Sequence, residues 1–139
     1  MRIQLFEIHL ETTDETDILD ITRQAQEKVL QSDIGDGSML IFIGGSTAAV
    51  TTIEYESGVV EDLAEAINRI APKNIPYRHD QRWGDGNGYA HVRASLLGPS
   101  LTVPIRDKKP LLGTWQQIVV VDFDNRPRRR EVVIQIMGE

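Results

Sequence analysis

The sequence predicts a single α+β domain over residues 1–139, with a mostly antiparallel sheet and two or three helices. Strand-like and helical segments are mixed in the first hundred residues, whereas the last third contains only strand-like segments separated by short turns. Strands joined by such short connections pair antiparallel, because a parallel crossover needs about a dozen residues or more. A length of 139 residues fits one hydrophobic core.

The first thirty residues predict a strand and then a helix. Residues 3–10 read as a strand whose apolar phase shifts once, which indicates either a bulge or burial on both faces. Residues 12–17 are polar and turn-like. A helix is expected at residues 20–31, because Asp20 is a suitable N-cap and apolar residues follow at helical spacing.

The next segments predict two strands and the clearest helix of the chain. Residues 39–43, MLIFI, form a short apolar run, which is typical of a strand buried on both faces. Residues 50–55 predict a second strand. Apolar residues at steps of three and four predict a helix over residues 58–70, which Pro72 ends.

The remaining chain predicts a long loop, a short helix and three strands. The loop covers residues 71–88, and loops of this length in a small domain are usually functional or disordered. Its Trp83 argues against disorder. A short helix is expected at residues 89–97. The strands are expected at residues 101–105, 114–123 and 129–137, with Trp115 in the core and the last strand pairing back after a turn.

Composition and charge exclude several classes of protein. The net charge is −6, and a nucleic-acid surface is usually basic, so we expect no nucleic-acid partner. No apolar run approaches the roughly 18 residues of a membrane span, and the N-terminal segment lacks the apolar block of a signal peptide. The absence of cysteine excludes disulfides and thiolate chemistry. We therefore expect a cytoplasmic protein with no membrane partner.

Two of the three histidines, His79 and His91, flank the glycine-rich part of the long loop. Their separation of 12 residues matches no standard zinc spacing. Closure of the loop would bring both imidazoles into one site, where they could bind a metal or act as acid or base at about pH 7. The alternative is that each histidine lies separately, on the surface or in the core.

The GGSTAA segment, residues 44–49, is a second candidate. Two glycines allow a close approach of the backbone to a ligand, and the hydroxyls and amides of Ser46 and Thr47 suit a phosphate oxygen. A tight turn between two strands is the other interpretation. Glu54 and Glu56 share one face of the following strand and can bind a divalent cation or remain solvated.

A basic cluster near the C-terminus is a third candidate. Arg128 and Arg130 share one face of the last strand, and Arg129 lies on the other. Guanidinium groups suit phosphate, because they form bidentate hydrogen bonds. The alternative is a charged strand edge that discourages aggregation.

Together these segments resemble the YjbQ-like family of secondary thiamine-phosphate synthases. The matching pieces, in the order of the family, are residues 41–54 (IFIGGSTAAVTTIE), 77–79 (YRH), 87–91 (NGYAH), 96–100 (LLGPS), 112–116 (LGTWQ) and the arginine-bearing last hairpin. Each piece alone is weak evidence for the resemblance, whereas the complete set in this order is specific for the family.

The resemblance implies an α+β domain that usually assembles as a homotrimer. It implies a shared pocket that contains His79 and His91, and it carries a family glutamate over to Glu54. We expect these three residues to be catalytic, through metal binding or proton transfer, with a divalent metal such as Mg²⁺ or Zn²⁺ and no organic cofactor. The residues expected to bind a phosphorylated substrate are Ser46, Thr47, Asn87, Arg128, Arg129 and Arg130. The implied reaction joins a pyrimidine diphosphate to a thiazole phosphate and releases pyrophosphate.

The chain departs from the family at one motif. Many members carry a histidine in an H-T-T-A motif, and this chain has Gly45 at that place. Without that histidine the chain must work with Glu54, Glu56 or a water molecule instead. The alternative function is therefore a non-catalytic trimeric protein that binds a metal or a metabolite.

Overall fold

The computed structural model describes residues 1–13 and 16–139, and its strands form two sheets. In spatial order, the larger sheet consists of β1 (Arg2–Glu11), β8 (Arg129–Gly138), β3 (Gly37–Ile43), β5 (Ser100–Arg106) and β6 (Lys109–Pro110). The smaller sheet consists of β2 (Asp17–Asp20), β7 (Gln117–Asp122) and β4 (Ala48–Ile53). All neighbouring strands are antiparallel, which confirms the predicted α+β class.

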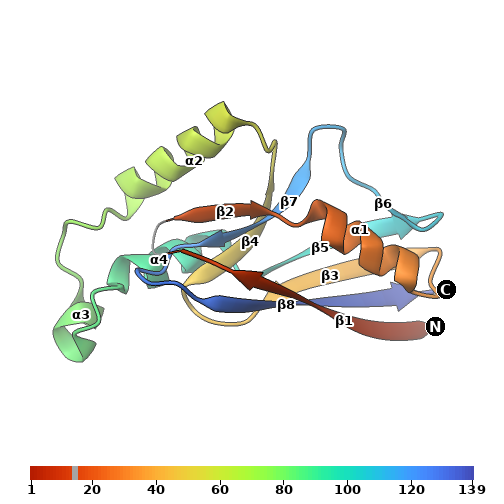
Figure 1. The fold of residues 1–139 in the computed structure, drawn as a ribbon, viewed down its shortest axis with the longest axis horizontal. Helices are drawn as coiled ribbons and strands as arrows, with labels where there is room; N and C mark the ends of the chain where they lie inside the picture. The colour runs from red at the N-terminus through yellow and green to blue at the C-terminus, as the bar shows by residue number, and fades with distance from the viewer. Residues whose placement is uncertain (14–15) are drawn as a thin grey trace.

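The helices of the described part are α1 (Thr22–Gln31), α2 (Ser57–Ile70), α3 (Arg78–Trp83) and α4 (Gly88–Leu97). Helix α1 contributes to the core between the two sheets, and α2 and α4 pack on the other face of the smaller sheet. Helix α3 projects at one end of the molecule, and both chain termini lie at the opposite end (Figure 1). Within the described residues, no helix is both long and apolar enough to cross a bilayer.

Strand β7 is shared by two hydrophobic clusters. Its Ile118 and Val120 lie in the cluster between the sheets, whereas Val119 and Val121 lie in the cluster beneath α2 and α4. All four residues are buried, as expected for a strand covered on both faces. The end of β7, which carries Asp122 and leads directly to Asp124, is therefore held from both sides.

The last strand pairs differently from the prediction. Strand β8 pairs with β1 and β3 in the larger sheet, whereas β7 pairs with β2 and β4 in the smaller one. The connection at residues 123–128 therefore crosses from one sheet to the other instead of closing a hairpin. Both edges of β7 are already paired, so β8 has no free edge of that strand to join.

Strand β3, which was expected to be buried on both faces, and β1, for which a bulge was the alternative to such burial, each leave one face exposed. Leu40 and Phe42 of β3, and Ile3 and Leu5 of β1, point outward from the larger sheet. The continuous pairing of β1 with β8 shows that no bulge causes the phase shift. The larger sheet therefore has an outer face that carries exposed apolar side chains.

Besides the two-residue β6, two short elements were not predicted. Helix α3 lies inside the expected loop at residues 71–88, and β2 begins within the expected turn at residues 12–17. Residues 14 and 15 of that turn lie outside the described residues. Both elements are too short to show a clear apolar period, so sequence patterns could not identify them.

Two further details differ from the prediction. Trp115 precedes β7 and is 70% exposed, so it is not a core residue. Helix α1 begins at Thr22, and the carboxylate of Asp20 accepts a hydrogen bond from the backbone N–H of Thr22 at 2.9 Å. Asp20 therefore supports the start of the helix without being the N-cap residue itself.

The contact between α3 and α4 leaves no room for a side chain at Gly88. Its N–H donates to Asp80 Oδ1 at 2.8 Å, and an added Cβ would lie 2.6 Å from Tyr77 Cβ. Gly88→Ala should displace α3 and lower the free energy of unfolding by about 1–3 kcal/mol. Gly35→Ala is the control, because a Cβ there would meet its nearest atom at 3.7 Å. Urea unfolding measures both variants, and equal stabilities would contradict the described packing.

Candidate functional site

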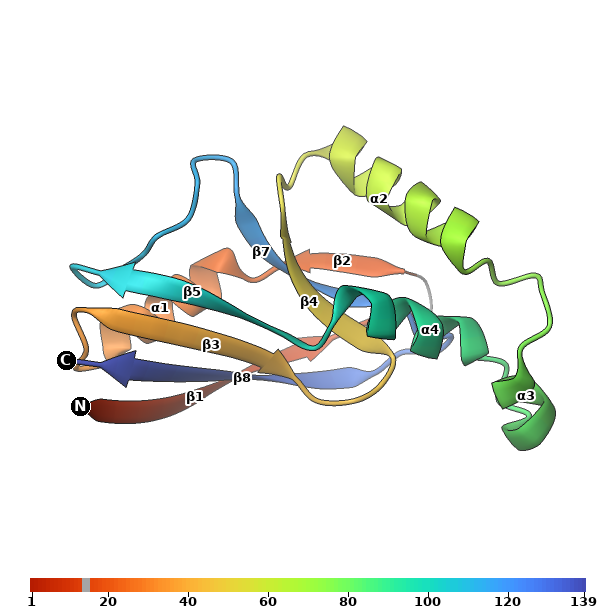
Figure 2. The same cartoon turned by 180° about the vertical axis from the view of Figure 1, so that it is seen from behind.

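Two connections between strands and two helical segments meet at one end of the molecule and surround a polar cavity. They are the β3–β4 turn, helix α3, the start of α4 and the β7–β8 connection (Figures 1 and 2). The cavity has a volume of about 450 Å³ and is lined by Gly45, Ser46, Thr47, His79, Trp83, Asp85, Asn87, His91, Arg128 and Arg130. This volume is in the range of pockets that hold small organic ligands.

The structure brings His79 and His91 together. His79 lies near the start of α3, and His91 lies in the first turns of α4. Their ring centroids are 4.3 Å apart, and the ring planes are tilted by 38°. The two imidazoles therefore lie in one polar cavity, although they are 12 residues apart along the chain.

Two carboxylates flank His79. Asp80 Oδ1 and Asp85 Oδ1 each lie 3.5 Å from His79 Nδ1, but neither contact has hydrogen-bond geometry. The Nδ1 atom is buried and has no hydrogen-bond partner among the described residues. The potential ligand atoms of the three residues lie within 4.8 Å of one another. A buried polar atom without a partner is rare, and these three groups lie close enough together to hold a cation.

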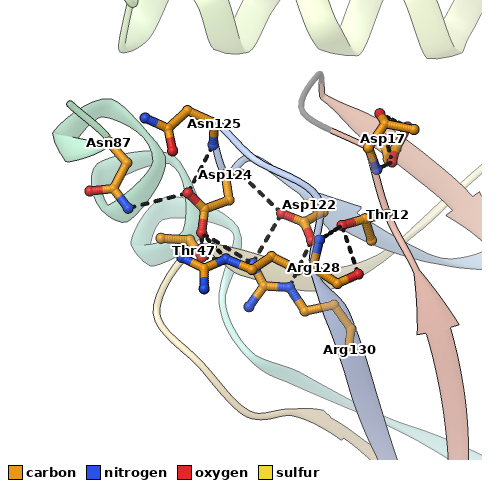
Figure 3. Close-up of polar contacts among 10 residues, drawn as sticks. Thr12, Asp17, Thr47, Asn87, Asp122, Asp124, Asn125, Arg128 and Arg130 are labelled. Atoms are coloured by element: carbon orange, nitrogen blue, oxygen red, sulfur yellow. Dashed lines mark hydrogen bonds and ion pairs between the residues drawn. The ribbon is translucent and has the colours of Figure 1, made fainter. Parts of the chain in front are cut away.

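Arg130 is held by a buried carboxylate (Figure 3). Its Nε donates to Asp122 Oδ2 at 2.7 Å, and its Nη2 donates to Asp122 Oδ1 at 3.0 Å. Nη2 also donates to Thr47 Oγ1 at 2.7 Å. The side chains of Arg130 and Asp122 are only 10% and 1% exposed. This bidentate contact fixes the plane of the guanidinium group and pairs the buried charge of Asp122.

A second buried carboxylate, Asp124, organises the neighbouring groups. It accepts hydrogen bonds from Arg128 Nε at 2.7 Å, Thr47 Oγ1 at 3.1 Å and Asn87 Nδ2 at 3.2 Å. Burial alone would raise the pKa of Asp124, but hydrogen bonds from Asn87, the following backbone amide and Arg128 lower it below its ordinary value. Asp124 is therefore a carboxylate that connects α4, the β3–β4 turn and β8.

Asn87 carries a second buried atom without a partner. The residue is 5% exposed, and its Oδ1 has no hydrogen-bond partner in the part of the chain that the structure describes. An unpaired buried acceptor costs roughly 1–3 kcal/mol. This oxygen can therefore accept a hydrogen bond from a ligand or contact a cation in the cavity.

The environment of His91 favours its neutral form. Burial lowers the pKa of His91 below 6.5, and the charge of His79 lowers it further. The carboxylates of Asp124, Asp85 and Asp80 act in the opposite direction without reversing the shift. A neutral imidazole can accept a proton or bind a metal ion.

Glu54 does not reach this cavity. It follows the end of β4 and is exposed, and it is not among the cavity-lining residues. It lies six residues beyond Ala48, which corresponds to roughly 20 Å along an extended strand. The nearby Glu56 caps α2, because its Oε2 accepts the N–H of Val59 at 2.9 Å. The expected metal set of His79, His91 and Glu54 is therefore not assembled in this chain.

Arg129 also lies outside the cavity. Its side chain is 93% exposed, and its Nε lies 3.8 Å from Glu11 Oε1. Arg130 of β8 and Arg128, which directly precedes the strand, lie on the other side, as the sequence predicts. Of the expected phosphate-binding residues, all except Arg129 line the cavity.

Sequence reasoning missed the carboxylates of this site. Asp122 and Asp124 follow the apolar run of β7, and the later Arg128 and Arg130 have the same spacing of two residues. Residues two apart on a strand share a face, so these two spacings together indicate paired rows of opposite charge. No comparable sequence pattern marked Asp80 and Asp85, because only the fold of α3 and of the turn after it brings them beside His79.

The fold and this cavity define a small α+β protein with a polar cavity at one end. The family model of the UPF0047 protein YjbQ-like family matches residues 6–139. The chain therefore belongs to this family, which confirms the resemblance found in the sequence.

Relatives and solved structures agree with this assignment. A UPF0047 protein of Methanocaldococcus jannaschii is 36% identical over 136 residues, which cover 97% of this chain and 95% of that protein. A YbjQ-like protein of unknown function from Sulfolobus solfataricus has a TM-score of 0.89 and 31% identity, covering 99% of this chain and 100% of that one. An uncharacterised family protein from Clostridium acetobutylicum has a TM-score of 0.87 and 33% identity, covering 95% and 99% of the two chains.

The lowered pKa of His91 predicts a pH dependence of stability. The unfolded chain takes up a proton near pH 6.5, whereas the folded protein does so only at lower pH. His91 should therefore not lower the free energy of unfolding above about pH 6.5. As the pH decreases through that value, the free energy of unfolding should fall. His91→Gln should remove part of this decrease, and His9→Gln should not, because the His9 side chain is 71% exposed. Urea unfolding between about pH 7.5 and 5.5 measures both, and a wild-type slope in H91Q would contradict the assignment.

Proposed function

We propose that this protein is an enzyme that acts on a phosphorylated small molecule in the cavity of His79 and His91. The observation that carries the proposal is the pair of guanidinium groups, Arg128 and Arg130, held by buried carboxylates in the same cavity as the two imidazoles. The solved relatives are described as uncharacterised or of unknown function. The proposed reaction therefore rests on the resemblance and on the chemistry of this cavity.

The arginine side of the cavity supplies directed hydrogen-bond donors. Arg130 uses Nε and Nη2 for Asp122 and Thr47, and its Nη1 lies where a side chain at Gly45 would point. Arg128 uses only Nε for a protein contact among the described residues. The remaining N–H groups suit the oxygens of a phosphate, with Ser46 beside them in the lining.

The charge balance supports a cation together with the phosphate. The site combines the two arginines Arg128 and Arg130 with four aspartates, Asp80, Asp85, Asp122 and Asp124, giving a formal charge of −2 when both histidines are neutral. A phosphate alone would add further negative charge. A divalent cation removes this repulsion, so we infer that phosphate binding depends on a bound metal.

The histidine side offers the ligands for such a cation. His79 Nδ1 and the carboxylates of Asp80 and Asp85 form a mixed nitrogen and oxygen set. This set suits Zn²⁺ better than Mg²⁺, which prefers oxygen ligands. When bound, the cation would neutralise charge on the phosphate oxygens. The neighbouring His91 ring, with its lowered pKa, is available as a further ligand or hydrogen-bond partner.

The reaction implied by the resemblance is consistent with this arrangement. The thiazole nitrogen attacks the carbon that carries the diphosphate, so an N–C bond forms as the C–O bond breaks. Pyrophosphate leaves with the electron pair, and negative charge develops on its oxygens. Arg128 and Arg130 would stabilise that charge, because their donors are already oriented by Asp124 and Asp122.

A non-catalytic binding protein is the second candidate, and Gly45 favours it. Gly45 has φ of +104°, and an added Cβ would lie 3.0 Å from Arg130 Nη1. The backbone is therefore unsuited to the histidine that many relatives carry at this place. Binding of metal and phosphate without turnover would support this candidate.

The homotrimer expected from the resemblance stays a prediction. The outer face of the larger sheet exposes Leu5, Leu40 and Phe42. Exposed apolar surfaces of this kind mark sites of protein contact, so this face is where we expect copies of the chain to meet.

Metal binding should depend on the aspartate beside His79. Asp85→Asn removes a carboxylate that lies 3.5 Å from His79 Nδ1 and should weaken Zn²⁺ binding about tenfold or more. Asp62→Asn makes the same change on the exposed surface of α2 and should have no effect. Calorimetric titration with Zn²⁺ and Mg²⁺ measures both variants. Equal Zn²⁺ affinity in D85N and the wild type would remove Asp85 from the metal site.

Two neighbouring arginines provide a matched test of phosphate binding. Arg128→Gln should weaken pyrophosphate binding to the zinc-loaded protein roughly 10- to 150-fold, the usual effect of losing a hydrogen bond to a charged group. Arg129→Gln removes the same charge outside the cavity and should change affinity by less than about twofold. Calorimetry with and without Zn²⁺ measures both effects. Equal losses in the two variants would indicate general charge attraction instead of a site.

Turnover tests the reaction itself. Purified wild-type protein should release pyrophosphate from the pyrimidine diphosphate and the thiazole phosphate, and His79→Ala and His91→Ala should be slower. A coupled pyrophosphate assay measures the rates. Equal rates in all three proteins would exclude the histidines from the chemistry, and binding without turnover would favour the second candidate.

A further inference from the structure

Trp83 lines the cavity, but neither the histidines nor the arginines explain its position. It is 68% exposed, although tryptophan is on average a highly buried residue. It lines the same cavity as His79, Arg128 and Arg130. A large exposed ring beside a polar pocket indicates contact with a molecule outside the chain.

Helix α3 places Trp83 beside the histidine pair. Trp83 is the last residue of α3 and follows His79 by four positions, so both side chains project from one face of the helix. Gly84 ends the helix in the left-handed conformation with φ of 74°. The centroid of the His91 ring lies 4.3 Å from that of the His79 ring, so His91 adds a third ring beside Trp83 and His79. Three aromatic rings therefore line this side of the cavity.

One face of the indole already has a partner. The guanidinium carbon of Arg82 lies 5.7 Å from the centroid of the Trp83 ring, which is a cation–π distance. Because Trp83 is 68% exposed, a large part of the indole surface remains accessible to a flat group.

The cavity has more space than a phosphate group needs. Its volume of about 450 Å³ fits a small organic molecule. The donors of Arg128 and Arg130 account only for the anionic part of such a ligand. The rest of the ligand must contact other lining groups, among which Trp83 offers the largest apolar surface. A planar ring can stack face to face on the indole, whereas a puckered saturated ring contacts it only through a few C–H groups.

We infer that Trp83 selects ligands in which a flat aromatic or heteroaromatic ring carries the phosphate. Its free indole face stacks on the ring, while Arg128 and Arg130 hold the phosphate. This inference rests on the proposed phosphate site and adds the residue that determines specificity. A smaller hollow of about 180 Å³, lined in part by Ala48, Ala94 and Pro99, is the rival position for the ring.

The chain contains its own control for this inference. It has two tryptophans, and Trp115 is 70% exposed at a distance from the cavity lining. Trp83→Leu and Trp115→Leu therefore make the same change in similarly exposed residues. The probes are phenyl phosphate, cyclohexyl phosphate and inorganic phosphate, each titrated calorimetrically into the zinc-loaded protein. The first two probes carry the same charge and differ in the flatness of the ring.

We expect W83L to weaken phenyl phosphate binding about five- to 150-fold, the range of a lost stacking contact. Its affinities for cyclohexyl phosphate and inorganic phosphate should stay within about twofold of wild type, which also shows that the variant is folded. W115L should leave all three affinities unchanged. Equal weakening of phenyl and cyclohexyl phosphate, or no weakening, would overturn the inference and favour the smaller hollow. Failure of all three probes to bind the wild type would overturn the proposed phosphate site as well.

Fluorescence gives an independent readout. W115L retains Trp83 as its single tryptophan, and its emission should change on addition of phenyl phosphate but not of inorganic phosphate. W83L, which retains Trp115, should show no change with either probe. Ligand-free emission of W115L that depends on protein concentration would show that another copy of the chain covers Trp83, and this result would overturn the inference.

Discussion

The buried ion pair between Arg130 and Asp122 is the contact on which the site depends. Asp122 ends β7 in the smaller sheet, and Arg130 lies near the start of β8 in the larger sheet, so the pair connects the two sheets. Removing one partner of such a buried pair typically costs about 3–5 kcal/mol, whereas replacing both with apolar residues is often neutral. Stability alone therefore does not require charges here. Arg130 lies in the cavity wall and Asp122 fixes its orientation, which gives a functional reason for the pair.

The second carboxylate extends this connection to the helical side. Asp124 lies two residues after Asp122 and contacts Asn87 at the start of α4, Thr47 in the β3–β4 turn and Arg128 before β8. These groups come from distant parts of the sequence, and hydrogen bonds fix them around one point. Because β7 is packed on both faces, the two carboxylates start from a rigid strand. A preorganised set of donors suits charge that develops during a reaction.

Periodic patterns predicted the parts of the fold that depend on local sequence. The stripe from Val60 to Ile70 predicted α2, and the apolar runs predicted β3, β4 and β7 to within a few residues. Patterns did not predict which strand β8 would join, because pairing depends on which edges are free in the folded protein. They also did not show that Leu40 and Phe42 face outward. A continuous apolar run looks the same in a strand buried on both faces and in a strand with one exposed apolar face.

The candidate site was predictable where alternation or motif order applied. His79, His91, Arg128 and Arg130 were identified, and the structure brings them into one cavity. Glu54 was assigned from the resemblance and from its place beside Glu56 on one face of the expected strand, and the length of β4 carries it away from the cavity. The acidic partners of His79 depend on the fold of a six-residue helix that has no buried residue, so no hydrophobic signal marks it.

The two ends of the chain lie together at the end of the molecule remote from α3 (Figure 2). The N-terminal amine is 2.9 Å from the Glu139 side chain, and residue 139 pairs with the turn before β3. A short linker could therefore join the termini, and new ends could be opened at the exposed turn of Asp107 and Lys108. Such a circular permutant would reorder the chain while the cavity remained intact. The protein could then be attached to a surface or a sensor with its ligand site facing the solution.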